Sequence, residues 1–175
     1  VKGGDPFIFG RGGEELAVLR EAGIPVVVVP GITAALGAAA SAGLPLTHRG
    51  IAQAVTFVTA TGTQAINLDW RALAQPQHTV VFYMGGAQAA YIARQLDAHG
   101  LPPTTPVALL ERATWPDERV LKTTLAELAA TATAAQLRSP TLLVVGEVAA
   151  LAQVKGLIGE AATTAGLATD NGTGG

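Results

Sequence analysis

The sequence contains no cysteine in its 175 residues, and this absence excludes disulfides, thiolate metal sites and cysteine nucleophiles. Charged residues are scarce, at 14% with a net charge of −2, so we expect no nucleic-acid partner drawn by a broad basic surface. The apolar runs are short, and the longest are far below the roughly 20 residues that a membrane helix needs. With no leader-like segment at the start, these absences favour a soluble cytoplasmic protein without a membrane partner.

Several catalytic patterns are missing as well. The three histidines, His48, His78 and His99, lack metal-ligand spacing, so we expect no bound metal. No G-x-S-x-G motif presents a serine nucleophile, and the glycines of FGRGG do not have the spacing of a dinucleotide-binding loop. The chain is nevertheless 49% hydrophobic, enough for a substantial core in one large or two small domains.

Glycine, by contrast, is concentrated at the start, where residues 1–15 read VKGGDPFIFGRGGEE. Glycine lacks a Cβ atom, so such a loop lets backbone N–H groups approach a ligand closely. Glu14 and Glu15 follow, in the first turn of a predicted helix, where the positive end of the helix dipole favours acids. The other interpretation is a tight strand-to-helix turn without a ligand.

Apolar runs and helical patterns alternate along the rest of the chain, which is typical of α/β layering with ligands beyond the carboxyl ends of strands. Patterning and turn residues predict helices over 14–23, 34–42, 70–74, 87–99 and 125–137, and a short helix beginning near residue 148. Thr33 is expected to cap the second of these helices. Strands are predicted over 26–29, 55–59, 79–83, 106–111, 119–123 and 141–146.

Five segments carry a resemblance to a known family. The segment 1–15 resembles the glycine-rich signature of the tetrapyrrole methylases, in particular of the uroporphyrinogen-III C-methyltransferases that use S-adenosylmethionine. Four further segments are similar to that family in the same order, so the resemblance spans about residues 1–155. They are VVVVPGITAALGAAASAGLPLTHRG (26–50), TVVFYMG (79–85), PVALLERAT (106–114) and SPTLLVVGEVAAL (139–151).

The resemblance implies a tetrapyrrole methylase-like fold: two α/β domains with the cofactor in the cleft between them, and the front part of the first domain missing. We expect a boundary at the proline- and glycine-containing connector 44–50. Residues 1–46 would then be the remainder of the N-terminal α/β domain, and 47–160 the C-terminal α/β domain. The small, polar, glycine-rich tail 161–175 is predicted to be disordered.

The resemblance also implies which residues bind S-adenosylmethionine. Exposed backbone N–H groups suit the cofactor's carboxylate, an acid suits its ammonium or ribose hydroxyls, and a thioether packs well on adenine. Ala113 stands where the family usually has glycine, so its methyl group is expected to crowd the adenine. The family's acid and base belong to the missing front part, so no catalytic residue is assigned. The implied cofactor-binding residues are Gly3, Gly4, Asp5, Ile8, Thr33, Ala34, Met84 and Ala113.

The implied reaction is methylation of uroporphyrinogen III at two pyrrole carbons, giving precorrin-2 for sirohaem or cobalamin, by a homodimer. The eight carboxylates of this substrate need local cations, and Arg11, His48, Arg49 and Arg119 are the candidates, with surface salt bridging as the other interpretation of each. Two alternatives stay open. One is a methyltransferase of the same fold that acts on RNA or protein, and the other is an inactive fragment that only supports dimerisation.

Overall fold

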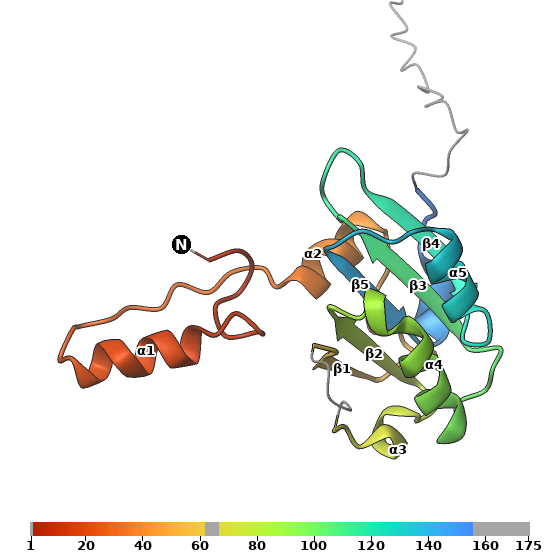
Figure 1. The fold of residues 1–175 in the computed structure, drawn as a ribbon, viewed down its shortest axis with the longest axis horizontal. Helices are drawn as coiled ribbons and strands as arrows, with labels where there is room; N and C mark the ends of the chain where they lie inside the picture. The colour runs from red at the N-terminus through yellow and green to blue at the C-terminus, as the bar shows by residue number, and fades with distance from the viewer. Residues whose placement is uncertain (1, 62–66, 156–175) are drawn as a thin grey trace, which may run out of the picture.

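Five short runs rich in valine and leucine form one mixed sheet in the computed structural model, which describes residues 2–61 and 67–155 (Figure 1). The strand order is β1-β2-β5-β3-β4. Only the β1–β2 pair is parallel among these neighbours, since β5 runs antiparallel to both β2 and β3, and β3 runs antiparallel to β4. The strands are β1 Ala54–Thr59, β2 His78–Tyr83, β3 Pro106–Glu111, β4 Arg119–Thr124 and β5 Thr141–Val145.

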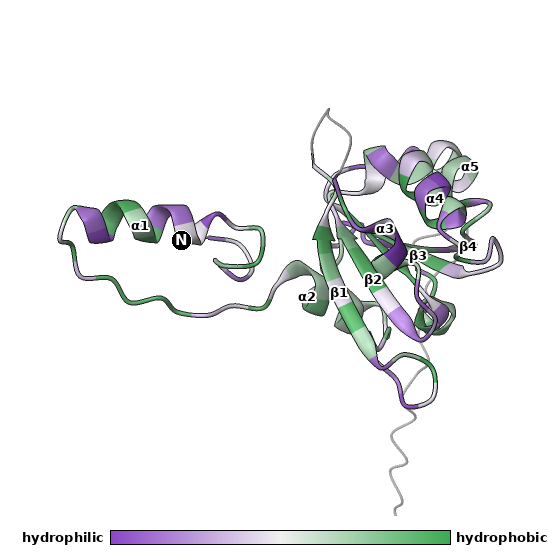
Figure 2. Cartoon of the chain, turned by 90° about the horizontal axis from the view of Figure 1, so that it is seen from below, coloured by the Kyte–Doolittle hydropathy of each residue, from purple (hydrophilic) through white to green (hydrophobic). Residues whose placement is uncertain are grey.

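Alternating side chains of the central strands build a core on each face of this sheet. In β2, Val81 and Tyr83 face one core while Val80 and Phe82 face the other, and all four are buried. Figures 1 and 2 show helices on both faces. The first core is covered by α2 Ala34–Ser41 and the 3-10 helix η2 Glu147–Leu151. The second is covered by α3 Trp70–Leu73, α4 Ala89–Ala98, which follows the 3-10 helix η1 Gly86–Gln88, and α5 Leu128–Ala134.

The segment before α2 forms an arm that extends away from the sheet (Figure 1). It holds α1 Gly12–Glu21, as predicted, and then returns toward α2 in an extended course. The predicted strand Val26–Val29 is wrong, because the structure assigns no strand there and Val27 is 89% exposed. Figure 2 shows this returning segment as apolar over much of its length. A strand needs a neighbour for its backbone N–H and C=O groups, and none of the described residues supplies one.

The other predicted elements are confirmed, with shifts at their ends. The helix predicted over 125–137 is shorter, because residues 125–127 form a turn and Gln136 has a positive φ of 47° beyond the helix. The element near Val148 is a 3-10 helix. Among the described residues no helix is both long and apolar enough to cross a bilayer. The predicted tail 161–175 lies outside the described residues, and the domain division stays a prediction, although α2 packs on the sheet.

Candidate cofactor-binding cleft

The Asp5 side chain forms hydrogen bonds within the glycine-rich loop and from this loop to the turn before α2. One carboxylate oxygen accepts the N–H of Phe7 at 2.9 Å, and the other accepts the N–H of Gly31 at 3.1 Å. These backbone hydrogen bonds, the one from Phe7 first, lower the pKa of Asp5 below its usual value. The loop and the turn before α2 are in close backbone contact, since a Cβ atom on Gly31 would lie 2.2 Å from the carbonyl oxygen of Gly4.

The start of α2 is held by a side chain from the sheet. Thr33 occupies the predicted N-cap position, but its side chain makes no capping hydrogen bond to the helix. Its Oγ1 atom instead lies 2.6 Å from the hydroxyl oxygen of Tyr83, the last residue of β2. The same hydroxyl oxygen accepts the N–H of Ala35 at 3.0 Å. A tyrosine therefore takes the place of the expected threonine cap.

Two loops bring strained backbone to the ends of the strands. Met84 follows β2 with φ 56° and is half-exposed. In the loop after β3, Ala113 lies between Arg112 with φ 49° and Thr114 with φ 70°. Left-handed backbone at residues other than glycine costs free energy and is concentrated at ligand sites. Both loops contain a residue that the resemblance assigns to the cofactor.

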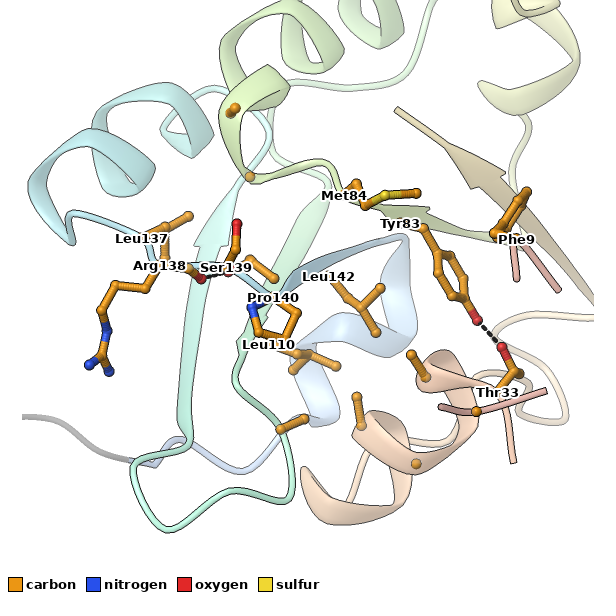
Figure 3. Close-up of a pocket in the computed structure, with 18 of the residues that line it drawn as sticks. Phe9, Thr33, Tyr83, Met84, Leu110, Leu137, Arg138, Ser139, Pro140 and Leu142 are labelled. Carbon is orange, nitrogen blue, oxygen red and sulfur yellow. Dashed lines mark hydrogen bonds between the residues drawn. The ribbon is translucent and has the colours of Figure 1, made fainter. Parts of the chain in front are cut away.

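These segments enclose one open cavity of about 1470 Å³ between the arm, α2, the ends of β2 and β3, and α5. Figure 3 shows Tyr83, Thr33, Phe9 and Met84 gathered at one side of it. Its volume exceeds the roughly 300 to 1,000 Å³ of a common small-molecule pocket, so it has room for a nucleoside and a second ligand. Every residue predicted to bind the cofactor lines it, namely Gly3, Gly4, Asp5, Ile8, Thr33, Ala34, Met84 and Ala113.

Sequence reasoning missed part of the lining. Phe9 and Tyr83 contact each other in the cavity, with ring centroids 4.8 Å apart, and Trp115, on the loop after β3, also lines it. Aromatic residues are only 5% of the chain, so a cluster of them beside the matched motifs was a usable signal. No comparable feature of the sequence marked α5 and the segment after it as part of the cavity lining. The residues there are Ala129, Ala132, Thr133, Gln136, Leu137 and Arg138.

The four basic residues predicted for the substrate do not line this cavity. Arg11 pairs with Glu14 at 2.5 Å, and Arg119 pairs with the buried Glu111. His48 and Arg49 line a separate hollow of about 390 Å³. Within the described lining of the large cavity, Arg138 is the one basic side chain. Its Nε atom donates to Glu111 at 2.8 Å.

A second acid, the partly buried Glu118, holds the loop after β3 against α2. Its side chain is 9% exposed and accepts the hydroxyl of Ser41 at 2.5 Å and the N–H of Thr114 at 2.7 Å. Lys155 adds an ion pair at 3.3 Å. Burial raises the pKa of Glu118, but the hydrogen bonds from Ser41, Thr114 and Lys155 and the charge of Lys155 together outweigh it, so the pKa is lowered. Across residues 2–61 and 67–155, no group of three or more histidine, aspartate or glutamate side chains could hold a metal.

The mixed sheet with helices on both faces, together with a glycine-lined cavity at its strand ends, defines an α/β protein with a candidate small-molecule site. The family model of the Tetrapyrrole (Corrin/Porphyrin) Methylases matches residues 1–129. The chain belongs to this family. The fold class predicted from the sequence is thereby confirmed, and solved structures of the family support it.

Similar proteins include two siroheme synthases. Siroheme synthase 1 of Aeromonas hydrophila is 54% identical over 168 residues, covering 95% of this chain and 36% of that protein. Siroheme synthase 1 of Yersinia pseudotuberculosis is 56% identical over 149 residues, covering 85% of this chain and 31% of its own length. The chain thus spans about a third of the length of these curated relatives.

Solved structures of tetrapyrrole methylases are also similar to this chain. Uroporphyrin-III C-methyl transferase from Thermus thermophilus, complexed with S-adenyl homocysteine, superposes with a TM-score of 0.73 at 39% identity. The match covers 85% of this chain and 64% of that one. A cobalt precorrin-4 methyltransferase matches with a TM-score of 0.77 at 26% identity, covering 83% of this chain and 62% of that one.

Proposed function

We propose that this protein takes part in S-adenosylmethionine-dependent C-methylation of uroporphyrinogen III at two pyrrole carbons, giving precorrin-2. Membership of the tetrapyrrole methylase family supports the reaction class. Similarity to siroheme synthases and to a uroporphyrin-III C-methyl transferase supports the substrate. The observation that carries the proposal is the convergence of all eight predicted cofactor-binding residues, from four separate segments, on one cavity. We further propose that the protein is a homodimer, as the resemblance implies, and that it is cytoplasmic, as its short apolar runs favour.

The lining fits S-adenosylmethionine. Gly3 and Gly4 present bare backbone to the cavity beside the Asp5 carboxylate. Each oxygen of Asp5 accepts one backbone N–H and keeps a further lone pair for a ligand ammonium or hydroxyl. Met84, half-exposed at the end of β2, provides a polarizable surface for an aromatic ring. In this arrangement the arm would bind the polar amino-acid end of the cofactor and the sheet its nucleoside.

When bound, the cofactor supplies a methyl group that its sulfonium has already activated, so transfer makes one carbon–carbon bond, breaks one carbon–sulfur bond and releases a proton from the substrate. The chain's own task is therefore alignment and exclusion of water. Phe9, Tyr83, Leu110 and Leu142 give the cavity apolar walls (Figure 3). The part of the cavity that the eight predicted cofactor-binding residues do not line would hold the tetrapyrrole acceptor. No residue is assigned as acid or base.

Calorimetry with S-adenosylhomocysteine tests cofactor binding directly. We expect one site per chain, and the absence of binding would favour an inactive fragment that only supports dimerisation. Incubation with methyl-labelled S-adenosylmethionine and uroporphyrinogen III then tests the substrate. Transfer of two labelled methyl groups, with the absorbance of a dimethylated product, is the expected result. Cofactor binding together with methylation of RNA or protein, but not of the tetrapyrrole, would overturn the substrate assignment.

A further inference from the structure

Tyr83 lies at the end of β2 and contacts two other segments of the chain that contribute residues to the cavity. Its ring lies 4.8 Å from that of Phe9, in the glycine-rich loop. Its hydroxyl oxygen lies 2.6 Å from Oγ1 of Thr33 and 3.0 Å from the backbone nitrogen of Ala35, at the start of α2. Met84, the next residue, begins the turn that leaves β2. Figure 3 shows the side chain crossing from the strand toward Thr33, with Phe9 on its flank.

The environment of this hydroxyl makes its hydrogen bonds costly to lose. Tyr83 is 6% exposed and Thr33 is 5% exposed, so water cannot easily replace either partner. The N–H of Ala35 is one of the first N–H groups of α2, which have no partner within the helix. Thr33 does not cap this helix itself. Without the tyrosine hydroxyl, a buried N–H and a buried hydroxyl would both lose their described partner.

The ring and the hydroxyl have separable tasks. The ring packs in the first core, between Phe9 and Phe57, whose centroid lies 5.9 Å away. A phenylalanine at this position would keep those contacts. The hydroxyl connects strand β2 to the start of α2, 48 to 50 residues away in sequence. It therefore fixes where Thr33 and Ala34 lie relative to Met84.

We propose that Tyr83 is a positioning residue for cofactor binding. The Tyr83 hydroxyl caps α2, and it holds the corner formed by Thr33 and Ala34 in a fixed position relative to Met84 and the glycine-rich loop. This inference rests on the proposed function, because the corner matters only if these segments bind one ligand. Tyr83 acts through Thr33 and Ala34, and its hydroxyl is occupied by them. The other tyrosine, Tyr91, packs against Trp70 on the opposite face of the sheet and serves as the matched control.

The test compares Tyr83→Phe with Tyr91→Phe in the full chain. For Tyr83→Phe we expect the dissociation constant of S-adenosylhomocysteine to rise roughly tenfold, because two buried polar groups lose their partner. In turnover, the KM for S-adenosylmethionine should rise while the KM for uroporphyrinogen III changes little. Tyr91→Phe should leave both unchanged. Equal affinity in the wild type and Tyr83→Phe, or equal loss in both variants, would overturn the proposal.

Amide hydrogen exchange of the ligand-free protein separates this inference from the proposed function. In Tyr83→Phe, exchange at residues 34–37 should accelerate at least severalfold, while amides of β3 and β5 keep their protection. Unchanged exchange at 34–37 would overturn the capping role whether or not the protein binds S-adenosylhomocysteine. If the wild type fails to bind that ligand but the exchange changes as expected, the proposed function fails and the cap remains.

Discussion

Asp5 connects two parts of the chain that are 26 residues apart, because its carboxylate accepts the N–H of Gly31 at 3.1 Å. It also accepts the N–H of Phe7, at 2.9 Å. These two hydrogen bonds hold the glycine-rich loop against the turn that leads into α2. Both segments line the cavity, so the carboxylate that we expect to meet the cofactor also shapes its own site.

Replacing Asp5 should therefore weaken binding in two ways. For Asp5→Ala we expect the affinity for S-adenosylhomocysteine to fall by roughly tenfold or more, since a charge-assisted contact and the loop's internal acceptor are lost together. Asp5→Asn keeps one acceptor oxygen, so its affinity for S-adenosylhomocysteine should lie between those of the wild type and Asp5→Ala. Calorimetry on the three proteins provides the measurement, and an alanine variant that binds as tightly as the wild type would contradict this role.

Gly31 tests the close approach of the same two segments. A Cβ atom there would lie 2.2 Å from the carbonyl oxygen of Gly4, so Gly31→Ala must push the loop away from the turn. We expect binding of S-adenosylhomocysteine to be lost while the far-ultraviolet circular dichroism of the sheet and helices stays the same. Gly13→Ala is the matched control, because nothing lies within 4 Å of a Cβ atom there. Retained binding in Gly31→Ala would show that the segments need not touch.

The strand ends could be predicted from local sequence patterns, and the eight candidate cofactor residues from the family resemblance. Valine-rich runs followed by glycine or proline indicate strands that end at turns, and the family motifs lie at those ends. The failed strand at Val26–Val29 shows the limit of this reasoning. A β-branched run indicates that a segment is suited to a sheet, but pairing needs a neighbouring strand, and sequence pattern does not show whether one is present.

The role of Tyr83 and the ion pair of Arg119 could not be predicted from the sequence pattern either. Each depends on a partner brought close by the fold. The hydroxyl of Tyr83 meets groups 48 and 50 residues away, and Arg119 meets Glu111 across the β3–β4 pair. Arg119 was a candidate for the substrate because the substrate's carboxylates need local cations, but its side chain instead compensates the buried Glu111.

Glu111 is the acid whose loss should cost the most stability. Its side chain is fully buried, and it accepts hydrogen bonds from Arg119 and from both the backbone and the side chain of Arg138. For Glu111→Gln we expect the free energy of unfolding to fall by about 2 to 3 kcal/mol, somewhat below the loss for a fully buried pair because the arginines stay partly exposed. Urea unfolding measures this loss. The exposed Glu127→Gln is the control and should change stability by less than about 0.5 kcal/mol.

The contribution of Glu111 should also depend on pH. Burial raises the pKa of Glu111, but hydrogen bonds from Arg119 and Arg138 outweigh it, so its pKa in the folded state is lowered. A lowered pKa means that the unfolded chain takes up the proton first, so the stabilisation is complete above a pH of about 4.3, the usual pKa of glutamate. It is lost as the pH falls through the lowered pKa of the folded state. Urea unfolding of the wild type and Glu111→Gln from pH 7 to pH 3 should therefore show a difference that is constant above about pH 5 and shrinks below pH 4. A difference that stays the same at pH 3 would mean that the pair contributes through packing and not through charge.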